Sequence, residues 1–214
     1  MTAAQRPVLL RSTVGLLASL TLAAGLQLPA QAPAEAAPAD ITHAQLKAMF
    51  GSRVSKHPRV AQNLGSLNRE MRAAGITTPQ RQAAFLSTLV NESRMDPAAN
   101  ERGVRSRYKG RGYIQLTGAW NYRAAGREIG VNLSRNPAAA ASPRYSARIA
   151  TWYWADLRPG SNRAADRFDM GRISRNVGYA YSAREDRERC ADFKRAYKVL
   201  SGKNAPRQTV CARH

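Results

Sequence analysis

Residues 83–126 read AAFLSTLVNESRMDPAANERGVRSRYKGRGYIQLTGAWNYRAAG, and this stretch decides how the rest of the chain is interpreted. Its first part is periodic in apolar residues, as an amphipathic helix is. The Asp96-Pro97 step then ends the helix, because the residue before a proline avoids the helical region. Glu92 precedes this break and Glu101 follows it, ahead of a Gly-Arg-Gly turn. The stretch therefore predicts two carboxyl groups on different local structures that are close in sequence.

The helix is predicted to begin at Pro79, with Thr78 as its capping residue, since proline suits the first turn of a helix. Phe85, Leu89 and Glu92 are spaced four and three residues apart and so share one helix face. Glu92 thus extends an apolar face. A carboxyl group held against hydrophobic side chains has a raised pKa, which suits it to donate a proton.

Glu101 has a different neighbourhood, because Arg102, Arg105 and Arg107 lie beside it in the sequence and would favour its ionised form. Two carboxyls in opposite environments are the general requirement for glycoside hydrolysis, in which one protonates the leaving oxygen and the other activates water. Taken alone, Glu101 is better interpreted as a solvated surface charge, which is the usual state of a glutamate.

Three segments resemble family 19 glycoside hydrolases, which include chitinases and related phage-type endolysins. They are Arg107-Tyr-Lys-Gly-Arg-Gly-Tyr-Ile-Gln-Leu-Thr117, then Asn121-Tyr122, then Ala125-Gly-Arg-Glu-Ile-Gly130. The similarity runs from about Ile41 to Leu200. It implies a lysozyme-like α+β fold, predominantly α-helical, in which two helical lobes flank a cleft with a small β hairpin beside it.

The resemblance also implies roles for individual residues in an inverting mechanism. Glu92 takes the place of the general acid, and Glu101 takes that of the base. Asp96 is the alternative base. Thr117 takes the place of the residue that helps hold the attacking water.

Other positions are implied as sugar contacts. Gln115 and Asn121 would line the cleft, and Asn176 corresponds to a later cleft asparagine. Arg189 resembles an arginine that organises the acidic pair, although it could equally be a surface partner of Glu185 four residues before it.

Several aromatic residues could stack on a sugar ring. The best candidates are Tyr108, Tyr113 and Trp120. Residues 152–154, Trp-Tyr-Trp, alternate poorly with polar positions, so we expect at least two of them in the core.

The sequence departs from the family pattern close to the expected cleft. Asn91 replaces a histidine, and Arg94 and Val177 replace glycines. The interval between the two glutamates is also short. We therefore expect an open groove with few sugar subsites, suited to a flexible glycan better than to crystalline chitin.

The expected helices follow from caps and apolar spacing. Their ranges are about 42–50, 58–74, 79–93, 119–129, 143–156 and 183–200. Strand signals are weak, and the predicted hairpin or ribbon falls around 100–117.

Residues 1–36 are predicted to be a secretory signal peptide. Arg6 and Arg11 precede an apolar run from Val14 to Leu28, and Ala34-Glu35-Ala36 fits the small-residue cleavage rule. An uncleaved anchor is the alternative, but about 15 apolar residues fall short of the about 20 that span a membrane. We expect residues 37–214 to form one secreted catalytic domain that acts as a monomer without stable membrane insertion.

The chain carries a formal net charge of +20, from 34 basic and 14 acidic residues. Such a charge attracts polyanions, and anionic cell-wall polymers are the expected partners outside a cell. An arginine excess that reflects base composition alone is the alternative explanation. Nucleic acid is not expected, because the chain has a secretion signal and lacks a clustered lysine-arginine helix.

Cys190 and Cys211 are the two cysteines, and in an oxidising exterior we expect them to pair, although two buried thiols would also fit. The three histidines, His43, His57 and His214, lack metal-ligand spacing. The proposed hydrolysis needs no metal or cofactor.

The sequence thus predicts a secreted endo-hydrolase of β-1,4-linked, N-acetylglucosamine-containing polysaccharide, either chitin or peptidoglycan. The alternative is a catalytically inactive cell-wall-binding protein that retains the fold, suggested by the altered positions near the cleft.

Overall fold

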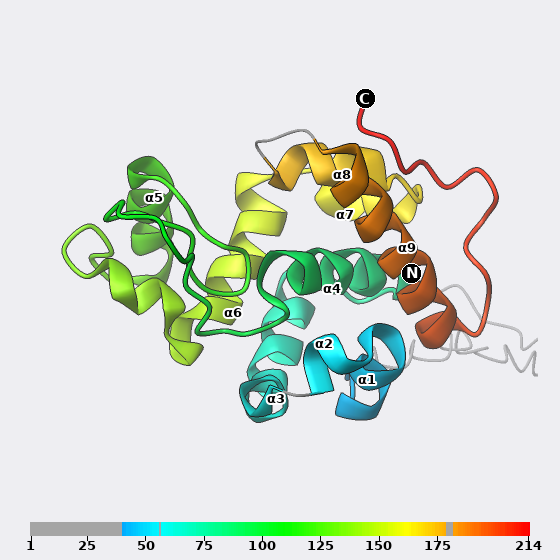
Figure 1. The fold of residues 1–214 in the computed structure, drawn as a ribbon, viewed down its shortest axis with the longest axis horizontal. Helices are drawn as coiled ribbons and strands as arrows, with labels where there is room; N and C mark the ends of the chain where they lie inside the picture. Colours follow the sequence, from blue (N-terminus) through cyan, green and yellow to red (C-terminus); the bar gives the residue numbers. More distant parts are fainter. Residues whose placement is uncertain (1–39, 56, 179–181) are drawn as a thin grey trace, which may run out of the picture. The chain divides into compact units, whose positions relative to one another are not determined.

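Helix α4, Pro79–Ser93, forms the buried centre of the part of the chain that the structure describes (Figure 1). Its first turn is capped by the Thr78 side chain, which accepts the Arg81 amide at 3.4 Å. Its residues 82–90 are all buried, so neighbouring helices cover it on every side. It ends at Arg94, which adopts a left-handed conformation with φ 54°. This ending turns the chain away from the helix axis directly after Glu92.

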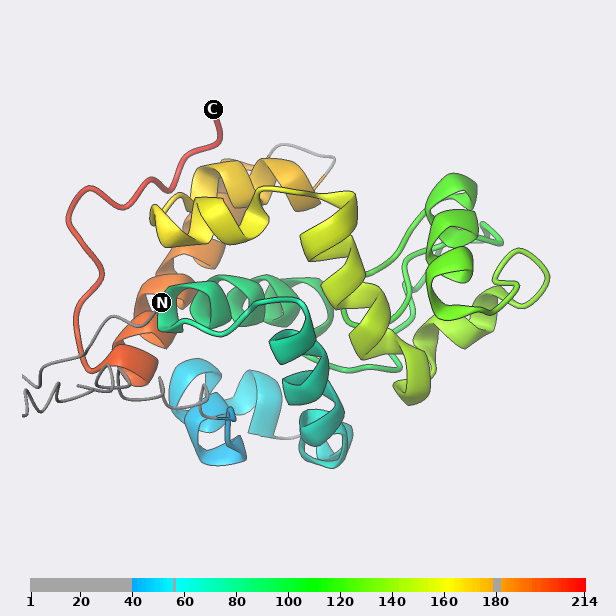
Figure 2. The ribbon, with the colours of Figure 1, turned by 180° about the vertical axis from the view of Figure 1, so that it is seen from behind.

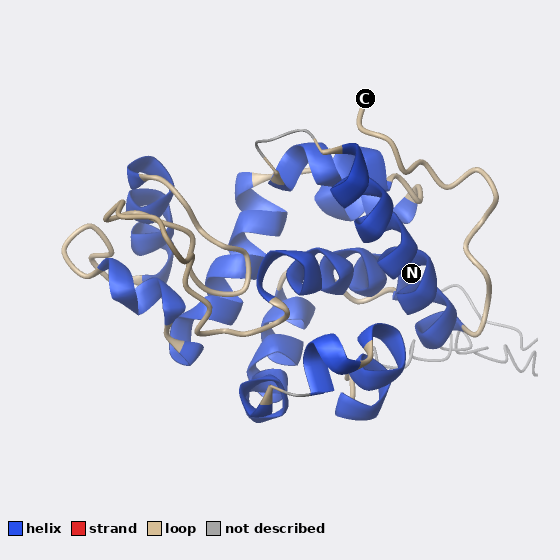
Figure 3. Cartoon of the chain, viewed as in Figure 1, coloured by secondary structure: helices blue, strands red, loops and turns tan. Residues whose placement is uncertain are grey.

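The computed structural model describes residues 40–55, 57–178 and 182–214, and nearly all regular structure within them is helical (Figure 3). The predicted signal peptide lies outside these residues. The other helices are α1 (His43–Phe50), α2 (Ser52–Ser55), α3 (Pro58–Ala73), α5 (Ala119–Ile129), α6 (Pro143–Trp152), α7 (Ser161–Asp166), α8 (Met170–Val177) and α9 (Ala183–Ser201), with a 3-10 turn at Pro137–Ala141 and a π turn at Tyr153–Leu157.

All six predicted helices are confirmed, as α1, α3, α4, α5, α6 and α9. The segment 143–156 is not one regular helix, however. Its α-helical part ends at Trp152, and the chain continues as the π turn Tyr153–Leu157. The short helices α2, α7 and α8 were not predicted, because their four to eight residues give too few periods to recognise.

The predicted hairpin around 100–117 is not present as a ladder in the described residues. Two single antiparallel bridges stand in its place, Asn100 with Arg111 and Arg111 with Leu116. Gly112 at φ 72° and Gln115 at φ 48° interrupt the extended backbone that a strand requires. The segment is therefore a tight looped turn.

The helices of residues 40–214 fall into two groups. The loop after α4 and helix α5 lie at one end, and α1, α2, α3, α7, α8 and α9 gather at the other (Figures 1 and 2). Helix α6 runs between them. Helix α4 packs chiefly against α9, which brings the end of α4 next to residues far along the chain.

The expected disulfide between Cys190 and Cys211 is present, with Cα atoms 5.5 Å apart. It ties the segment after α9 back to that helix. The same segment reaches α8, because the Val210 carbonyl accepts the Met170 amide at 2.9 Å. Within the described residues, no helix has both the length and the apolar character to cross a membrane.

Candidate active site

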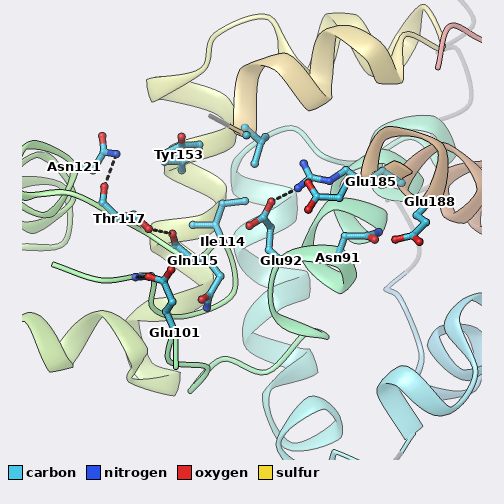
Figure 4. Close-up of a pocket in the computed structure, with 14 residues that line it drawn as sticks. Asn91, Glu92, Glu101, Ile114, Gln115, Thr117, Asn121, Tyr153, Glu185 and Glu188 are labelled. Atoms are coloured by element: carbon cyan, nitrogen blue, oxygen red, sulfur yellow. Dashed lines mark hydrogen bonds and ion pairs between the residues drawn. The ribbon is translucent and has the colours of Figure 1, made fainter. Parts of the chain in front are cut away.

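A cavity of about 530 Å³ opens where α4, α9 and the looped turn meet. Figure 4 shows side chains entering it from all three elements. Its lining residues are Asn91, Glu92, Glu101, Gly110, Ile114, Gln115, Thr117, Asn121, Tyr153, Val177, Gly178, Glu185, Glu188 and Arg189. The structure thus brings together six of the ten residues predicted for the site: Glu92, Glu101, Gln115, Thr117, Asn121 and Arg189.

Glu92 lies in the last turn of α4, and its side chain is 17% exposed. Arg189 Nη2 on α9 donates to Glu92 Oε1 at 2.5 Å. Burial raises the pKa of Glu92 above its ordinary value, and the positive charge of Arg189 opposes this rise without cancelling it. Glu92 therefore has the environment of a proton donor. Arg189 contacts Glu92, whereas the alternative interpretation paired it with Glu185.

Glu101 approaches the cavity from the loop and is held by backbone. The Gly110 amide donates to Glu101 Oε2 at 2.8 Å, and the Glu101 amide donates to the Gly110 carbonyl at 2.8 Å. The arginine environment expected from sequence is not what fixes it. Arg107, for example, donates to the backbone carbonyl of Ser134 at 2.8 Å. The backbone of the turn thus sets the direction of the Glu101 carboxylate.

A side chain at position 110 would disturb this geometry. A Cβ on Gly110 would lie 2.8 Å from Gln115 Oε1 and 3.3 Å from Glu101 Oε2. Gln115 itself has the left-handed φ of 48°, a conformation that costs a non-glycine residue on the order of 1 kcal/mol or more and that clusters at functional sites. This strained turn directs the polar side chains of Gln115 and Glu101 into the cavity.

A chain of hydrogen bonds links the remaining polar residues. Thr117 Oγ1 donates to the Gln115 carbonyl at 2.7 Å, and Asn121 Nδ2 donates to the Thr117 carbonyl at 2.8 Å (Figure 4). Gln115 Nε2 donates to the Gly112 carbonyl at 3.0 Å. These bonds fix the orientation of three side chains opposite Glu92.

The groove continues past the two glutamates. A second cavity of about 670 Å³ shares four lining residues with the first, namely Asn91, Glu92, Glu101 and Gln115. The carboxyl pair consequently lies where the two cavities adjoin.

Asp96, the alternative base, lines only the second of these cavities. Both of its carboxylate oxygens accept from Arg59, at 2.9 and 2.8 Å. Burial would raise the pKa of Asp96, but the bonds from Arg59 and from the Ala98 amide outweigh it, so that the pKa lies below its ordinary value. Asp96 is engaged in fixing the loop, which favours Glu101 as the base.

Among the described residues, three that were predicted to stack on a sugar ring do not line the first cavity. Tyr113 is 1% exposed and lies in the core, so this prediction is wrong. Tyr108 packs on Tyr122, with ring centroids 5.3 Å apart. Trp120 is 57% exposed but lies on the outer surface of α5. No local pattern indicates which side of the turn each ring occupies.

Residues 152–154 are 9% exposed or less, as expected for core residues. Trp154 packs edge-to-face on Phe85 at 5.3 Å between centroids. Tyr153 differs, because it also lines the cavity and presents an aromatic surface there.

Within the described residues, Asn176 does not line the first cavity either. Its Nδ2 donates to Ser161 Oγ at 3.2 Å and it lines an adjoining cavity. It lies at the end of α8, where a one-residue difference decides the side of the helix that it faces. Asn176 therefore lies outside the cavity that holds Glu92, and its predicted contact with a sugar stays a prediction.

Sequence reasoning missed three polar residues of the cavity. Glu185 and Glu188 lie three residues apart on α9, next to Arg189, and this helical spacing was the signal that could have revealed them. Asn91, noted only as a replacement, donates to Asp192 at 2.9 Å. The Asp192 carboxylate in turn accepts from Arg53 at 2.7 Å, so that a buried network supports the turn carrying Glu92.

Among the described residues, no group of three or more His, Cys, Asp or Glu side chains could hold a metal ion. The groove thus contains a largely buried carboxyl group with an arginine partner, a second carboxyl group that accepts one backbone amide, and a set of oriented hydroxyl and amide groups. This arrangement can protonate one oxygen and remove a proton from a water.

Known proteins resemble this chain in sequence and in fold. Residues 72–175 match the family model for chitinase class I, glycoside hydrolase family 19. Endochitinase A2 of Pisum sativum is 33% identical over 114 residues, which are 49% of this chain and 34% of that protein. An endochitinase of Avena sativa is 46% identical over 55 residues, which are 25% of this chain and 28% of that protein. The chain thus spans about a third of the length of these relatives.

Solved structures share the fold. Chitinase C from Streptomyces griseus HUT6037 superposes with a TM-score of 0.61 and 21% identity, covering 80% of both chains. Another bacterial family 19 chitinase superposes with a TM-score of 0.62 and 20% identity, covering 81% of this chain and 100% of that one. Just under half of the chain, residues 72–175, is thus similar to the class I chitinases of glycoside hydrolase family 19, and these solved structures share its fold.

Proposed function

We propose that this protein is a secreted, inverting endo-hydrolase of β-1,4 linkages in N-acetylglucosamine-containing polysaccharide. The observation that carries the proposal is the placement of Glu92 and Glu101. They enter one groove from two different elements, and each is held by a different kind of partner. The family's class I chitinases and the endochitinase relatives support a glycan substrate.

In the proposed reaction, Glu92 is protonated and gives its proton to the glycosidic oxygen as the bond to the anomeric carbon breaks. Glu101 takes a proton from a water that attacks the anomeric carbon from the opposite face. One C–O bond breaks and another forms, and the product anomer is inverted. Glu92 regains a proton and Glu101 loses one to solvent before the next turnover.

The environment of each carboxyl group suits its proposed role as acid or base. The raised pKa of Glu92 keeps a proton available at higher pH than an ordinary glutamate would. Glu101 accepts the Gly110 amide through Oε2, which leaves the other oxygen, Oε1, to face a water. Thr117 is the proposed second contact to that water, and Gln115 and Asn121 are proposed contacts to the sugar.

Internal cleavage follows from the continuous groove. Since the carboxyl pair lies between connected cavities of about 530 and 670 Å³, sugar residues can extend on both sides of the scissile bond. Secretion is proposed from the signal-peptide pattern of residues 1–36. The Cys190–Cys211 disulfide is consistent with an oxidising compartment.

The test is hydrolysis of soluble glycol chitin and of purified peptidoglycan, measured side by side. Native protein should release reducing ends from at least one polymer, and Glu92→Gln should lose this activity. Glu128→Gln on α5, where the carboxylate pairs with Arg148 and does not line the groove, is the matched control and should keep it. The anomer first formed, read by NMR, should be α.

The opposite result is equally informative. If native protein and Glu92→Gln are both silent on both polymers, the hydrolase proposal is wrong. Retained binding to the polymers would then favour the alternative of a wall-binding protein. A β product would leave hydrolysis in place and refute inversion.

A further inference from the structure

A third cavity, of about 310 Å³, adjoins the catalytic groove and has a different chemical character. Its lining residues are Arg158, Arg172, Arg175, Asn176, Val177 and Gly178. Val177 and Gly178 also line the cavity that holds Glu92. A polymer lying in the catalytic groove can therefore reach it without leaving the protein surface. It is called the arginine cavity below.

Two of its arginines are oriented by neighbours. The Arg158 guanidinium lies over the Tyr153 ring, 5.1 Å from the centroid, and its Nη2 donates to the Tyr153 hydroxyl at 3.3 Å. Arg175 Nη1 donates to the His214 carbonyl at 2.6 Å. Arg172 and Arg175 are three residues apart on α8 and so face the same way. The three guanidinium groups thus converge from α8 and from the chain after the π turn.

One donor in this group is not satisfied by the protein. Within the described chain, Arg158 Nε is buried and has no hydrogen-bond acceptor. A buried donor without a partner costs free energy, so the position of the Arg158 guanidinium is not explained by protein hydrogen bonds alone. Arg158 also lies on Tyr153, which itself lines the catalytic cavity, and this contact connects the two sites.

The charge changes sign between the adjoining cavities. The catalytic cavity is lined by four glutamates: Glu92, Glu101, Glu185 and Glu188. None of the six residues that line the arginine cavity is acidic. Asp169 is nearby, but one carboxylate oxygen accepts the Arg172 amide at 2.8 Å and the other lies 3.4 Å from His214. Asp169 is thus already engaged by the protein.

We propose that the arginine cavity binds a carboxylate carried by the polysaccharide in the groove, and so makes the enzyme prefer a carboxylate-bearing amino-sugar polymer over neutral chitin. The inference rests on the proposed function, since that function puts a glycan chain beside the cavity. Guanidinium groups bind carboxylates through paired hydrogen bonds. Chitin offers no such group, whereas the lactyl and peptide substituents of peptidoglycan do.

The experiment uses two polymers with the same backbone, glycol chitin and carboxymethyl chitin of equal chain length. Their dissociation constants are measured on Glu92→Gln protein, so that no hydrolysis occurs, and KM and kcat are measured on native protein. The cavity is altered by Arg172→Gln with Arg175→Gln. The matched control is Arg69→Gln with Arg123→Gln, which removes the same charge from the surfaces of α3 and α5, where neither residue lines the groove.

Carboxymethyl chitin should bind more tightly than glycol chitin, and the Arg172/Arg175 variant should lose this preference by about fivefold, as expected for two partly exposed ion pairs. The loss should fall on KM and not on kcat. The control pair should keep the preference. Carboxymethyl dextran, which lacks the amino-sugar backbone, reports attraction due to the net charge of +20 alone.

The inference is overturned if the Arg172/Arg175 variant keeps the full preference, or if both double variants lose it equally. It is also overturned if the Arg172/Arg175 variant loses as much affinity for carboxymethyl dextran as for carboxymethyl chitin. The cavity would then not recognise a carboxylate on a glycan held in the groove. Arginine-dependent preference without any hydrolysis would support the cavity and contradict the proposed catalytic function, so that the two failures are distinguishable.

Discussion

Arg189 on α9 donates a 2.5 Å hydrogen bond to Glu92 on α4, joining residues that are 97 positions apart in the sequence. Both side chains are largely buried, at 6% and 17% exposed. Two other nitrogens of Arg189, Nε and Nη1, are buried without an acceptor in the described chain. The guanidinium therefore has one strong bond in this structure, and that bond sets both the position and the charge of the proposed acid.

Replacing Arg189 by glutamine should lower kcat by about 100-fold, because a displaced catalytic group loses activity on that scale. The remaining activity should persist to higher pH than in native protein, since the pKa of Glu92 rises when its counter-charge is removed. Arg189→Lys keeps the charge and should restore the pH profile but only part of kcat. Unchanged pH profiles in both variants would show that Arg189 has a structural role alone.

The pH dependence of stability should also report on Glu92. The pKa of Glu92 is raised in the folded protein, so that the folded state binds its proton more tightly than the unfolded state does. This contribution to stability is fully present below the unfolded pKa, which is about 4.3 for a glutamate, and is lost as pH rises through the folded pKa. Glu92→Gln lacks the titration.

The measurement is chemical denaturation of both proteins across this pH window. The free energy of unfolding of native protein, taken relative to Glu92→Gln, should fall with a slope of up to about 1.4 kcal/mol per pH unit. A difference that rises with pH would contradict the direction assigned to Glu92.

The identity of the base can be tested by comparing Glu101→Ala with Asp96→Asn. Loss of a general base costs about a thousandfold in rate, and we expect this loss for Glu101. Asp96→Asn should lose little activity, because Asp96 is held by Arg59 and lines only the outer cavity. Azide needs no base to attack, so it should restore cleavage by Glu101→Ala and give an α-glycosyl azide. Rescue of the Asp96 variant instead would assign the base to Asp96.

The helices and the acid were predictable because their signals are local. Thr78, Pro79 and the spacing from Phe85 to Glu92 specify α4 with its cap and its buried face. The pKa direction expected for Glu92 matches the one in the structure, since an apolar helix face predicts burial. Local spacing also placed Glu185 near Arg189, although as a surface pair and not as part of the groove lining.

The features that could not be predicted from the sequence depend on tertiary packing or on turn conformation. Tyr113 and Thr117 belong to the same glycine-rich turn, yet the first is buried in the core and the second lines the groove. Positive φ values at Gly112 and Gln115 reverse the side-chain directions that an extended hairpin would have. The arginine environment expected for Glu101 was likewise replaced by a bond from Gly110.

Gly110→Ala should reduce kcat by about 10- to 100-fold while leaving the fold intact, because the added Cβ would displace Gln115 and Glu101 by a fraction of an ångström. The matched control is Gly65→Ala in α3, where a Cβ meets nothing within 4 Å. It should keep full activity and gain about 1 kcal/mol of stability from helix propensity. Full activity of Gly110→Ala would show that the position of Glu101 is not critical.

Removing the disulfide, by Cys190→Ser with Cys211→Ser, should lower stability by about 3 kcal/mol, the value for closing a loop of this size. The effect should reach the groove as well. The tail holds α8 through the Val210 carbonyl, which accepts the Met170 and Gly171 amides, and α8 carries Val177 of the catalytic cavity.

Activity of the disulfide-free protein should therefore fall at temperatures below its global melting point, as α8 separates from the tail. Gly171→Ala tests this connection independently, because its Cβ would collide with the Ala212 carbonyl and displace the tail while the disulfide stays closed. Both variants should share the early loss of activity in parallel scans of melting and hydrolysis. Loss of activity only at the melting transition in both would show that the tail supports the fold without acting on the groove.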